Sequence, residues 1–549
     1  MMSTPQLSGQ PILVLKESAT RTEGRDAQRA NVSAARVLGE LIRSSLGPKG
    51  MDKMIVDSFG DVTITNDGAT ILKEMEIEHP AAKMMVEVAK TQDQEVGDGT
   101  TTAVVLASEL LAKAQSLMEK DVHPSVIIEG FSTAFEVATA HLNKIAIKVQ
   151  PNDKIMLRKI AEVALATKLV GEQRKLLASL VVDAVLAVAE TKSGKNIVDI
   201  EDVKIEKKAG ESISDTRLIK GLVIDKEVVH TRMPKRVDNA KIALIIKPLE
   251  IEKTEFDSKL SIASPEQLES FMKKEENMIE EMVNRLHKVG ANVLMCQRGI
   301  DDMAQHFMSK RGILAIRRVK TSDMEHLAKA TGGKVITEVS HLESADLGHA
   351  KLVEERKIGD DKMLFIEGCK NPKAVTMFIR GGTERIINEA ERAIHDAICV
   401  VRDVVREPKI VAGGGAPEAE VAKKLRGYAR KISGRSQLAI LSFSDALESI
   451  PMALAENAGL DPVDILVDLR SKHDKGQIWA GVDPLKRKVS DISQIGVFEP
   501  MSVKRQAIAS STEAATMILK IDEMIAVGKG EGGPTPPTPP EEGTSEEES

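Results

Sequence analysis

The sequence predicts a multidomain protein in which an α/β domain is inserted into a helical one. Two observations carry this prediction. Apolar residues recur at helical spacing over roughly the first 190 residues and again beyond residue 384. Between residues 221 and 337, short apolar runs alternate with short helical patterns, which is typical of a parallel sheet with connecting helices. The length of 549 residues suffices for two to four such domains.

The composition excludes several classes of protein. Aromatic residues make up only 2% of the chain and the net charge is -7, which argues against binding nucleic acid through stacked bases or a basic surface. The three cysteines, Cys296, Cys369 and Cys399, show no CxxC spacing, so we expect neither a disulfide framework nor a structural zinc site. The N-terminus has no basic and apolar leader, and no apolar run reaches about 18 residues. We therefore expect a soluble cytoplasmic protein.

The first helical region opens with a helix over about Asp26–Leu46, whose apolar residues repeat every three to four positions. Gly47-Pro48 follows and is a typical helix stop. Short strand-like runs come next, at Met54–Asp57 and Val62–Thr65. Helical patterns then continue to about residue 150 and through Ile155–Glu190, so we expect this region to be mostly helical.

The α/β region contains five strand-like runs. They are Gly221–Ile224, Lys241–Ile246, Asn292–Cys296, Ile313–Ile316 and Lys334–Thr337. The last three are separated by helical segments at Asp301–Ser309 and Asp323–Ala330, so we expect parallel pairing of the βαβ type.

A longer helix, Pro265–Val289, lies inside the same region, with Ser264 as its N-cap and Gln267 completing a capping box. An apolar stripe that includes Phe271 and Met278 runs along it. The stripe either packs onto the sheet, which the pattern alone favours, or stays exposed and grips a partner.

Helical character returns at Glu384–Val405, Ala416–Ile432 and Thr512–Ala526. After Val527 the chain reads GKGEGGPTPPTPPEEGTSEEES. Such a Gly-, Pro- and Glu-rich tail cannot bury enough apolar surface to order itself.

Glycine-bearing motifs are the candidates for chemistry, although no GxxxxGK[ST] phosphate loop is present. Leu46–Gly50 (LGPKG), taken alone, favours a helix end. Asn66-Asp67-Gly68 is strong turn chemistry, and it could also present the Asp67 carboxylate to a water molecule or a metal. Gly413–Gly415 precede an expected helix and could either admit a nucleotide or form a flexible joint.

The stretch Glu95–Leu111, EVGDGTTTAVVLASELL, gives the strongest signal. Gly97 and Gly99 let backbone N–H groups approach an anion, and Thr100–Thr102 add hydroxyls at a helix N-terminus, which favours phosphate. Asp98 is a hard oxygen ligand suited to Mg²⁺. From the residues alone, a phosphate cradle and a simple helix start are equally favoured.

For two other carboxylates, the local sequence predicts no functional role. A helical wheel places Asp396 opposite the apolar stripe of Glu384–Val405, which predicts an ordinary solvated side chain. Glu499, in GVFEP, is equally unremarkable. The 11 histidines show no HExxH spacing, so a zinc hydrolase is not expected.

Together and in this order, the motifs resemble those of the group II chaperonins, the archaeal form in particular. The matching segments are LGPKGMDKM (46–54), TITNDGATIL (63–72), GDGTTTAVVLA (97–107), GGGAPE (413–418) and KRQAIASSTEAATMILKIDE (504–523). The resemblance extends from about Pro11 to Val527.

The resemblance implies a multidomain α and α/β fold, that of a chaperonin-type subunit. Residues 1–152 and 408–527 would form a helical equatorial domain that binds ATP. Residues 153–220 and 373–407 would form a split intermediate domain. Residues 221–372 would form the inserted α/β apical domain, and 528–549 a disordered tail. A helical protrusion at about 250–280 would serve as a built-in lid, with Phe256, Leu260 and Ile262 exposed for function.

The same resemblance assigns site residues. Asp98 would bind Mg²⁺, while Asp67 and Asp396 would position and activate the attacking water. The nucleotide-binding residues would be Leu46, Gly47, Pro48, Gly99, Thr100, Thr101, Thr102, Thr167, Lys168, Gly414, Gly415, Glu499 and Lys504. Among them, Lys168 would sense the terminal phosphate and Gly414 and Gly415 would approach the nucleoside.

The implied function is that of an ATP-dependent chaperone with ATP and Mg²⁺ as cofactors. Identical or paralogous subunits would form two stacked rings that enclose unfolded proteins, without nucleic-acid or membrane partners. Two alternatives remain open from the residues: a soluble metabolic phosphotransferase, and a structural ring or filament protein that binds ATP without useful turnover.

Overall fold

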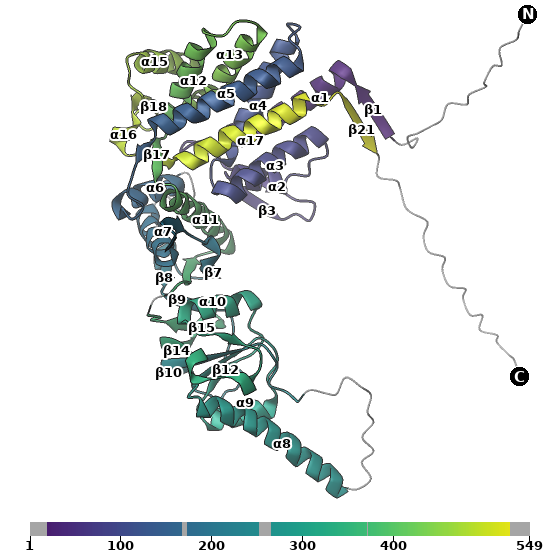
Figure 1. The fold of residues 1–549 in the computed structure, drawn as a ribbon, viewed down its shortest axis with the longest axis vertical. Coiled ribbons are helices and arrows are strands. Elements are labelled where there is room, and N and C mark those ends of the chain that lie inside the picture. Colours follow the sequence, from purple (N-terminus) through teal and green to yellow (C-terminus); the bar gives the residue numbers. More distant parts are fainter. Residues whose placement is uncertain (1–18, 167–172, 252–264, 371, 528–549) are drawn as a thin grey trace, which may run out of the picture.

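The computed structural model of the chain describes residues 19–166, 173–251, 265–370 and 372–527. The molecule is elongated, with three regions along its long axis (Figure 1). A helical body at one end contains residues from both ends of the chain, a smaller region lies in the middle, and a β-sheet with helices lies at the far end. The chain therefore runs out from the helical body to the sheet and back again.

The helical body is built from two sets of helices. The first comprises α1 (Gly24–Arg43), α2 (Gly68–Glu74), α3 (Pro80–Val96), α4 (Thr100–Met118) and α5 (Pro124–Ile145). The second comprises α12 (Ala416–Ala429), α13 (Arg435–Leu447), α14 (Ser449–Asn457), α15 (Pro462–Asp474), α16 (Ile492–Ile495) and α17 (Met501–Leu519).

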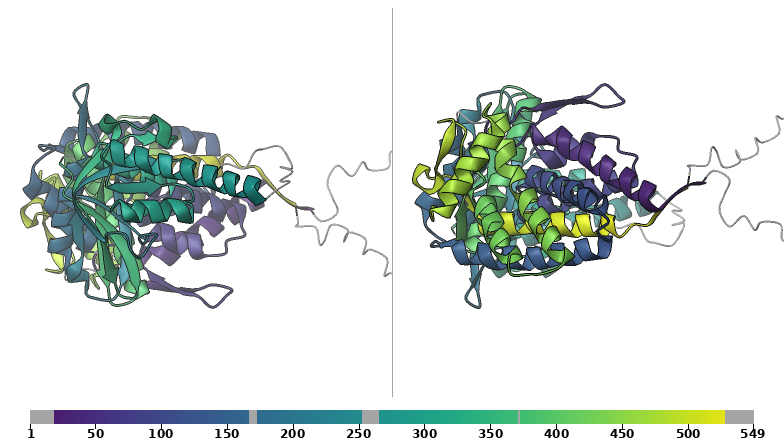
Figure 2. Two further views of the ribbon diagram at one scale, coloured as in Figure 1. Left: turned by 90° about the horizontal axis from the view of Figure 1, so that it is seen from below. Right: turned by 90° about the horizontal axis from the view of Figure 1, so that it is seen from above.

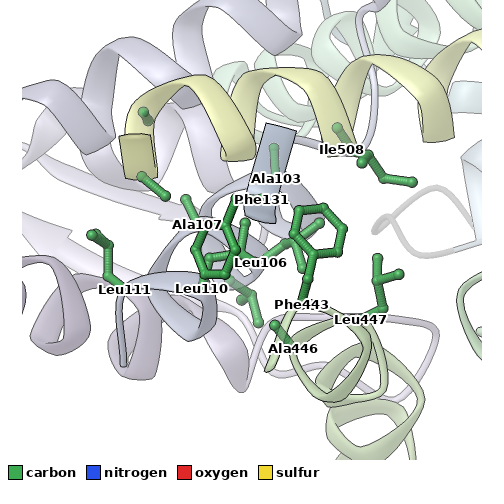
Figure 3. Close-up of a cluster of buried hydrophobic side chains, with 14 of the residues drawn as sticks. Ala103, Leu106, Ala107, Leu110, Leu111, Phe131, Phe443, Ala446, Leu447 and Ile508 are labelled. Carbon is green, nitrogen blue, oxygen red and sulfur yellow. The ribbon is translucent and has the colours of Figure 1, made fainter. Parts of the chain in front are cut away.

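Helix α4 is the centre of this body because its sequence is small or apolar on nearly every face. Phe131 of α5 and Phe443 of α13 meet edge to face beside it, with ring centroids 5.6 Å apart (Figure 3). Ile508 of α17 packs against the same cluster. Burial of α4 along its whole length holds its N-terminus, Thr100, in a fixed place.

Short strands join distant parts of the body. The two-stranded pairs are β1 (Ala19–Glu23) with β21 (Glu523–Val527), β2 (Lys53–Val56) with β3 (Val62–Thr65), and β18 (Ala480–Asp483) with β19 (Lys488–Asp491). A three-stranded sheet has the order β20 (Phe498–Pro500), β17 (Lys409–Ala412), β4 (Ile147–Lys148). All these pairs are antiparallel.

The middle region has its own hydrophobic core, formed by three helices packed beside a small sheet. The helices are α6 (Lys154–Ala166), α7 (Arg174–Val188) and α11 (Glu384–Arg406). The sheet has the order β7 (Val203–Ala209), β16 (Val375–Gly381), β8 (Arg217–Ile219), and a hairpin of β5 (Glu190–Lys192) and β6 (Lys195–Ile197) lies beside it.

The far region is a seven-stranded sheet with two further hydrophobic clusters, one on each side. Its order is β12 (Leu314–Ile316), β11 (Val293–Cys296), β10 (Arg236–Ile245), β14 (Gly348–Ile358), β15 (Asp361–Glu367), β9 (Gly221–Ile224), and β13 (Val335–Ile336) also pairs with β10. The helices are α8 (Pro265–Lys288), α9 (Asp302–Lys310) and α10 (Thr321–Thr331). The predicted parallel pairing is confirmed for β11 with β12, whereas β13 pairs in parallel with β10 rather than with β12.

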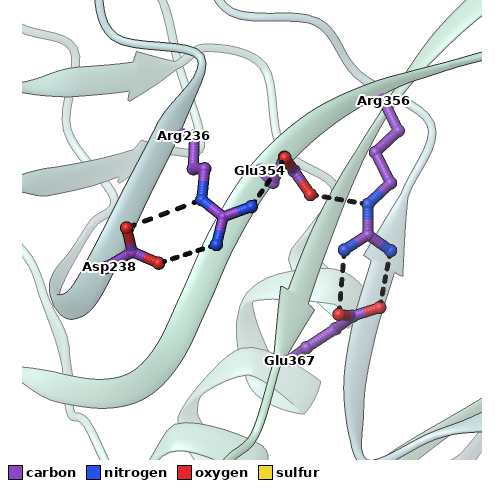
Figure 4. A network of polar contacts seen from close by, with 5 residues as sticks. All are labelled: Arg236, Asp238, Glu354, Arg356 and Glu367. Atoms are coloured by element: carbon purple, nitrogen blue, oxygen red, sulfur yellow. Dashed lines mark hydrogen bonds and ion pairs between the residues drawn. The ribbon is translucent and has the colours of Figure 1, made fainter.

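The antiparallel half of this sheet was not predicted. Strands β14 and β15 form a hairpin that continues the sheet from β10 to β9. Arg356 of β14 makes a bidentate pair with Glu367 of β15, at 2.7 and 2.9 Å, and also contacts Glu354 (Figure 4). Arg236 of β10 bridges Glu354 and Asp238 in the same network (Figure 4). The network links the side chains of three neighbouring strands.

Three predicted helices end earlier than expected. Helix α1 ends at Arg43, so Leu46–Pro48 form the turn that follows it. Helix α12 ends at Ala429 rather than Ile432. The prediction of helix through Ala526 was wrong, because α17 ends at Leu519 and Glu523–Val527 pair with the N-terminal strand β1 instead.

One segment of the described chain, Arg435–Asn457, is long and apolar enough to cross a membrane by length and composition. It comprises α13 and α14, and 72% of its most apolar window is buried inside the helical body. We attribute its apolarity to core packing.

Candidate functional site

A cavity of about 650 Å³ lies in the helical body, a size typical of sites for small molecules. Segments that are far apart in sequence line it. They include Ser45–Lys49, Asn66 and Asp67, Asp98–Thr102, Gly414 and Gly415, Val482–Leu485, Glu499, Val503 and Lys504. The structure thus brings all the glycine-bearing motifs to one place.

Several helices begin at this cavity. Residues in or directly before the first turns of α2, α4, α12 and α17 line its wall: Asp67, Gly99–Thr102, Gly414 and Gly415, and Val503 and Lys504. The starts of α4, α12 and α17 have no side-chain cap, so their first N–H groups lack such a partner and carry a positive partial charge. Their convergence makes this part of the cavity attractive to an anion, above all to phosphate.

The start of α4 is the part of the structure that bears on the two interpretations of EVGDGTTT. Gly99 occupies the N-cap in the left-handed conformation (φ +75°), and no side chain caps the helix. Thr100–Thr102 form the first helical turn, so none of them is a cap. The Asp98 side chain accepts a hydrogen bond from Gly99 N at 2.6 Å and also lines the cavity. An uncapped N-terminus beside three hydroxyls suits a bound anion.

Asp67 begins α2 and also lines the cavity, while its predicted presentation to a water molecule or a metal stays a prediction. Its Oδ2 accepts from Thr70 N and Thr70 Oγ1, each at 2.8 Å, which caps α2. Its Oδ1 accepts from Thr100 Oγ1 at 3.1 Å, which joins the turn to the start of α4. The two helices approach so closely that a Cβ on Gly68 would lie 2.7 Å from Thr101 Oγ1. Asp67 is therefore held rigidly at the cavity wall.

Glycines on the far wall are required for packing. Gly47 has φ +81°, and a Cβ there would lie 2.4 Å from a methyl carbon of Leu454. Gly415 has φ +75°, and a Cβ there would lie 2.7 Å from Pro451 Cβ. Larger residues at these positions would move α14, which also lines the cavity, and so change its shape.

A buried charge cluster closes another side. Lys504 Nζ lies 3.0 Å from Glu418 Oε1 and 2.7 Å from Glu499 Oε2. Burial alone would lower the pKa of Lys504, but the two carboxylates raise it well above its usual range, so this lysine stays charged. Sequence reasoning missed Glu418, which follows the GGGAP segment within the first turn of α12.

Asp396 corrects a sequence prediction and leaves another untested. The helical wheel predicted a solvated side chain, but Asp396 is only 8% exposed. Helix α11 is covered on two sides: one faces the middle core, and the other packs on the α3–α4 turn, where a Cβ on Gly97 would lie 2.3 Å from Cys399 Cβ. His395 lies 4.0 Å from Asp396, and its contacts with the Asp396 carboxylate and Cys399 raise the pKa of His395 to about 10. Asp396 stands beside the cavity turn but is not part of the wall.

Several predicted residues lie outside the described part of the chain. They are Thr167, Lys168, Phe256, Leu260, Ile262 and the N-cap Ser264. The helix after them, α8, divides into two halves. Ile279, Val283 and Leu286 are buried against the sheet, whereas Met272 and Met278 are 60% and 52% exposed. The stripe therefore packs onto the sheet in the second half of the helix, whereas Met272 and Met278 are exposed, and their binding of a partner stays a prediction.

The cavity also contains groups that no motif indicated. Lys159 of α6 and Arg174 of α7 add cations to its lining. Asp483, at the end of β18, is 4% exposed, and its Oδ2 has no hydrogen-bond partner among the described residues. Glu418 Oε2 likewise has no hydrogen-bond partner among the described residues. The pattern WAGVDP gave no sequence signal for Asp483, because its burial depends on β18 pairing with β19.

These residues fit a nucleotide with a bound divalent cation. Uncapped helix starts, threonine hydroxyls and the two cations suit phosphates, while buried carboxylate oxygens suit the hydroxyl and amino donors of a nucleoside. The described residues hold no group of three or more His, Cys, Asp or Glu side chains arranged for a metal ion. A cation here would depend on Asp98 together with phosphate oxygens, as Mg²⁺ commonly does.

Comparison with known proteins agrees with this fit. The model of the TCP-1/cpn60 chaperonin family matches residues 38–529. A thermosome subunit of Methanopyrus kandleri is 56% identical over 518 residues, which cover 94% of this chain and 95% of the relative. One from Pyrococcus horikoshii is 57% identical, covering 95% of both chains. Thermosome subunit beta of Archaeoglobus fulgidus is 55% identical, covering 96% of this chain and 98% of the relative.

The family match spans most of the chain and the relatives are more than half identical over nearly their full length. The resemblance to group II chaperonins inferred from the motifs is therefore confirmed. This chain belongs to the TCP-1/cpn60 chaperonin family.

Proposed function

We propose that the cavity binds and hydrolyses ATP with Mg²⁺, and that hydrolysis drives an enclosed chamber in which proteins fold. ATP-dependent chaperone activity follows from membership of the family. The observation that supports the site most strongly is the convergence of several helix N-termini and all the glycine motifs on one cavity.

The phosphate end would lie at the start of α4. The N–H groups of its first turn and the hydroxyls of Thr100–Thr102 would donate to phosphate oxygens, with Gly47 and Gly99 allowing close approach. Leu46 and Pro48 complete the wall opposite. Lys168 and Thr167 would lie at the terminal phosphate, by family resemblance.

Asp98 would hold Mg²⁺, which supplies charge neutralisation between phosphate oxygens. Asp67, fixed by Thr70 and Thr100, would orient the attacking water. Asp396 would accept the proton of that water once α11 has moved to bring it into the cavity. Phosphoryl transfer depends mainly on positioning and charge, so carboxylates at fixed places suffice.

The nucleoside would occupy the opposite end. Gly414 and Gly415 leave room for it, and Glu499 and Lys504 stand at its edge. Glu418 holds Lys504 from behind, so removing either carboxylate would disturb the other.

The three regions of the molecule support the expected domain division. The equatorial domain would comprise 1–152 and 408–527, the intermediate domain 153–220 and 373–407, and the apical domain 221–372. Each part holds most of one or two separate hydrophobic clusters, although Ile410 and Phe498 of the equatorial range belong to the middle cluster. Closure would rock the middle region, with α11, against the helical body.

Subunit assembly is supported by exposed apolar residues on the helical body. The β2–β3 hairpin and the turn before it carry Met51, Met54, Val56 and Phe59, which are 58–91% exposed. The hairpin and the β1–β21 ribbon both project from the body (Figure 2). Archaeoglobus fulgidus has relatives named thermosome subunit alpha and beta, so paralogous partners are proposed as well as identical ones. We expect two stacked rings in the cytoplasm, with residues about 250–280 as the lid.

Asp396→Asn tests the assignment of the site. The charge that accepts the proton is lost while the shape is kept, so steady-state ATP hydrolysis should fall about 100-fold or more, with ATP affinity changed less than about threefold. Asp360→Asn, an exposed carboxylate in the β14–β15 turn and outside the cavity, is the control. Unchanged hydrolysis in Asp396→Asn would refute the role of Asp396.

A further inference from the structure

Arg402 ties α11 to the end of α3. It is 5% exposed, and its Nη2 donates to the Glu95 carbonyl at 2.7 Å. That carbonyl belongs to the last turn of α3, where carbonyls lack helical partners and the helix dipole is negative, so a cation there is favourable. The link lies two residues before Gly97 and therefore at the entrance to the Gly97–Gly99 turn.

Asp403 completes the connection. Arg402 Nε donates to Asp403 Oδ1 at 2.9 Å, and Arg402 Nη2 lies 2.8 Å from the same oxygen. Asp403 Oδ2 accepts from Ser502 Oγ at 3.2 Å. Ser502 is in the first turn of α17, directly before Val503 and Lys504, which line the cavity. The pair thus joins α11 to two of the segments that form the cavity wall.

The same side of α11 carries Asp396. Seven residues, or about two helical turns, separate it from Asp403, so both lie on one face. Between them, Cys399 packs against Gly97 so closely that no Cβ would fit there. Packing at Cys399 sets the separation of helix and turn. The Arg402 link restrains how far α11 slides or rotates along that contact, together with the Arg505–Glu407 pair at the end of α11.

We propose that Arg402, held by Asp403, is the positioning residue that sets Asp396 relative to the Gly97–Gly99 turn. Arg402 touches neither the nucleotide nor the reacting atoms, and acts through α11. The proposal rests on the proposed role of Asp396. A guanidinium is required because one group must donate both to Asp403 and to the Glu95 carbonyl.

The test compares Arg402→Lys with Arg385→Lys in the full-length assembly. Lysine keeps the charge but cannot make the forked contact, whereas Arg385 lies exposed in the first turn of the same helix. We expect Arg402→Lys to lower kcat for ATP about 10- to 100-fold with KM changed less than about threefold, because misplacing a catalytic group affects turnover more than binding. Arg385→Lys should match the wild type.

The background of Asp396→Asn separates positioning from stability. If Arg402 acts through Asp396, adding Arg402→Lys to Asp396→Asn should leave the residual kcat unchanged. A further fall of similar size in that background would overturn the proposal, as would wild-type kcat in the single variant. If Asp396→Asn alone keeps full turnover, the proposed catalytic role of Asp396 is refuted. This outcome is distinct from failure of the proposal about Arg402.

Ser502→Ala is the milder variant if Arg402→Lys does not assemble. It removes one hydrogen bond to Asp403 and leaves the Arg402 contacts in place. We expect kcat to fall about two- to fivefold, again only when Asp396 is present. A rise in KM for ATP with unchanged kcat would contradict positioning and point to a simple effect on the cavity wall.

Discussion

At the start of α4, backbone groups are left for a ligand because glycine occupies the capping position. Gly99 has a left-handed conformation and offers no side chain, so the first-turn N–H groups have no side-chain cap. Asp98 folds its carboxylate back onto Gly99 N and still faces the cavity. The lack of a capping side chain at Gly99 therefore matters as much for the chemistry of this helix start as the side chains that are present.

A second feature at the scale of single residues is a polar network around Glu420. Glu420 Oε2 lies 2.7 Å from His473 Nδ1, and His473 Nε2 lies 2.9 Å from the Ala480 carbonyl, while His141 lies 3.7 Å from the other Glu420 oxygen. The network joins α5, α12, α15 and β18. Burial alone would raise the pKa of Glu420, but the two histidines and the charge of Lys423 lower it to about 2.

This network predicts a pH dependence of stability. The folded pKa of Glu420 is below its ordinary value of 4.5, so its stabilisation is complete above about pH 4.5 and is lost as the pH falls towards 2. Glu420→Gln should lose about 2 kcal/mol near neutral pH and much less near pH 3. Thermal unfolding at several pH values checks this, with the exposed Glu513→Gln as control. An equal loss at both pH values would contradict it.

At the scale of elements, the contact of α11 with the α3–α4 turn links the middle region to the cavity. Gly97 ends α3 in a left-handed conformation (φ +66°) and leaves no space for a side chain beside Cys399. A helix docked this closely transmits a movement of the middle region to the segment that carries Asp98.

Gly97→Ala should disturb this contact. Gly332 ends α10 in the same way (φ +75°) but has nothing within 4 Å of an added Cβ, so Gly332→Ala carries the backbone strain without the clash. We expect Gly332→Ala to cost about 1 kcal/mol, and Gly97→Ala to cost about 1–3 kcal/mol more and to lower ATP turnover. Thermal unfolding and ATPase assays compare them. If the two variants lost the same stability and the same ATP turnover, α11 would have shifted to accommodate the added methyl group without consequence.

Sequence reasoning located most elements but not their partners. The periodicity of α3, α4 and the parallel strands is local, and it predicted them. The segment Glu523–Val527 continues the apolar pattern of α17, yet it becomes a strand because it pairs with residues from the other end of the chain. Strand β14, GHAKLVEERKI, is too charged to signal a strand alone.

For the candidate site too, the sequence indicated some residues and missed others. Each of the four glycine motifs left a structural alternative open, and family resemblance assigned all four to one site; the structure brings the four segments to one cavity. Periodicity did not predict the burial of Asp396, because α11 is buried on two faces and the helical wheel identified only one of them. Asp483 and Lys159 escaped because only the tertiary fold brings them to the cavity. Family resemblance supplied Asp396, and nothing in the sequence supplied the other two.

For the whole molecule, the exposed apolar hairpin predicts how subunits meet. Met54, Val56 and Phe59 contribute little to the fold of one chain because they are 58–91% exposed. Replacing all three with Ser or Thr should leave helical content and unfolding of the isolated chain nearly unchanged, but should reduce the assembly to smaller species. Native mass spectrometry checks this, and an assembly of unchanged mass would contradict a subunit contact at the hairpin.

The central claim is that the cavity in the helical body is the site where ATP is hydrolysed with Mg²⁺ held at Asp98. Its most direct test is the rate of ATP hydrolysis by the intact assembly as Mg²⁺ is titrated, in the wild type and in Asp98→Asn. We predict that Asp98→Asn lowers the maximal rate about 100-fold or more and needs a higher Mg²⁺ concentration for half-maximal activity. A wild-type rate with wild-type Mg²⁺ dependence would contradict the account.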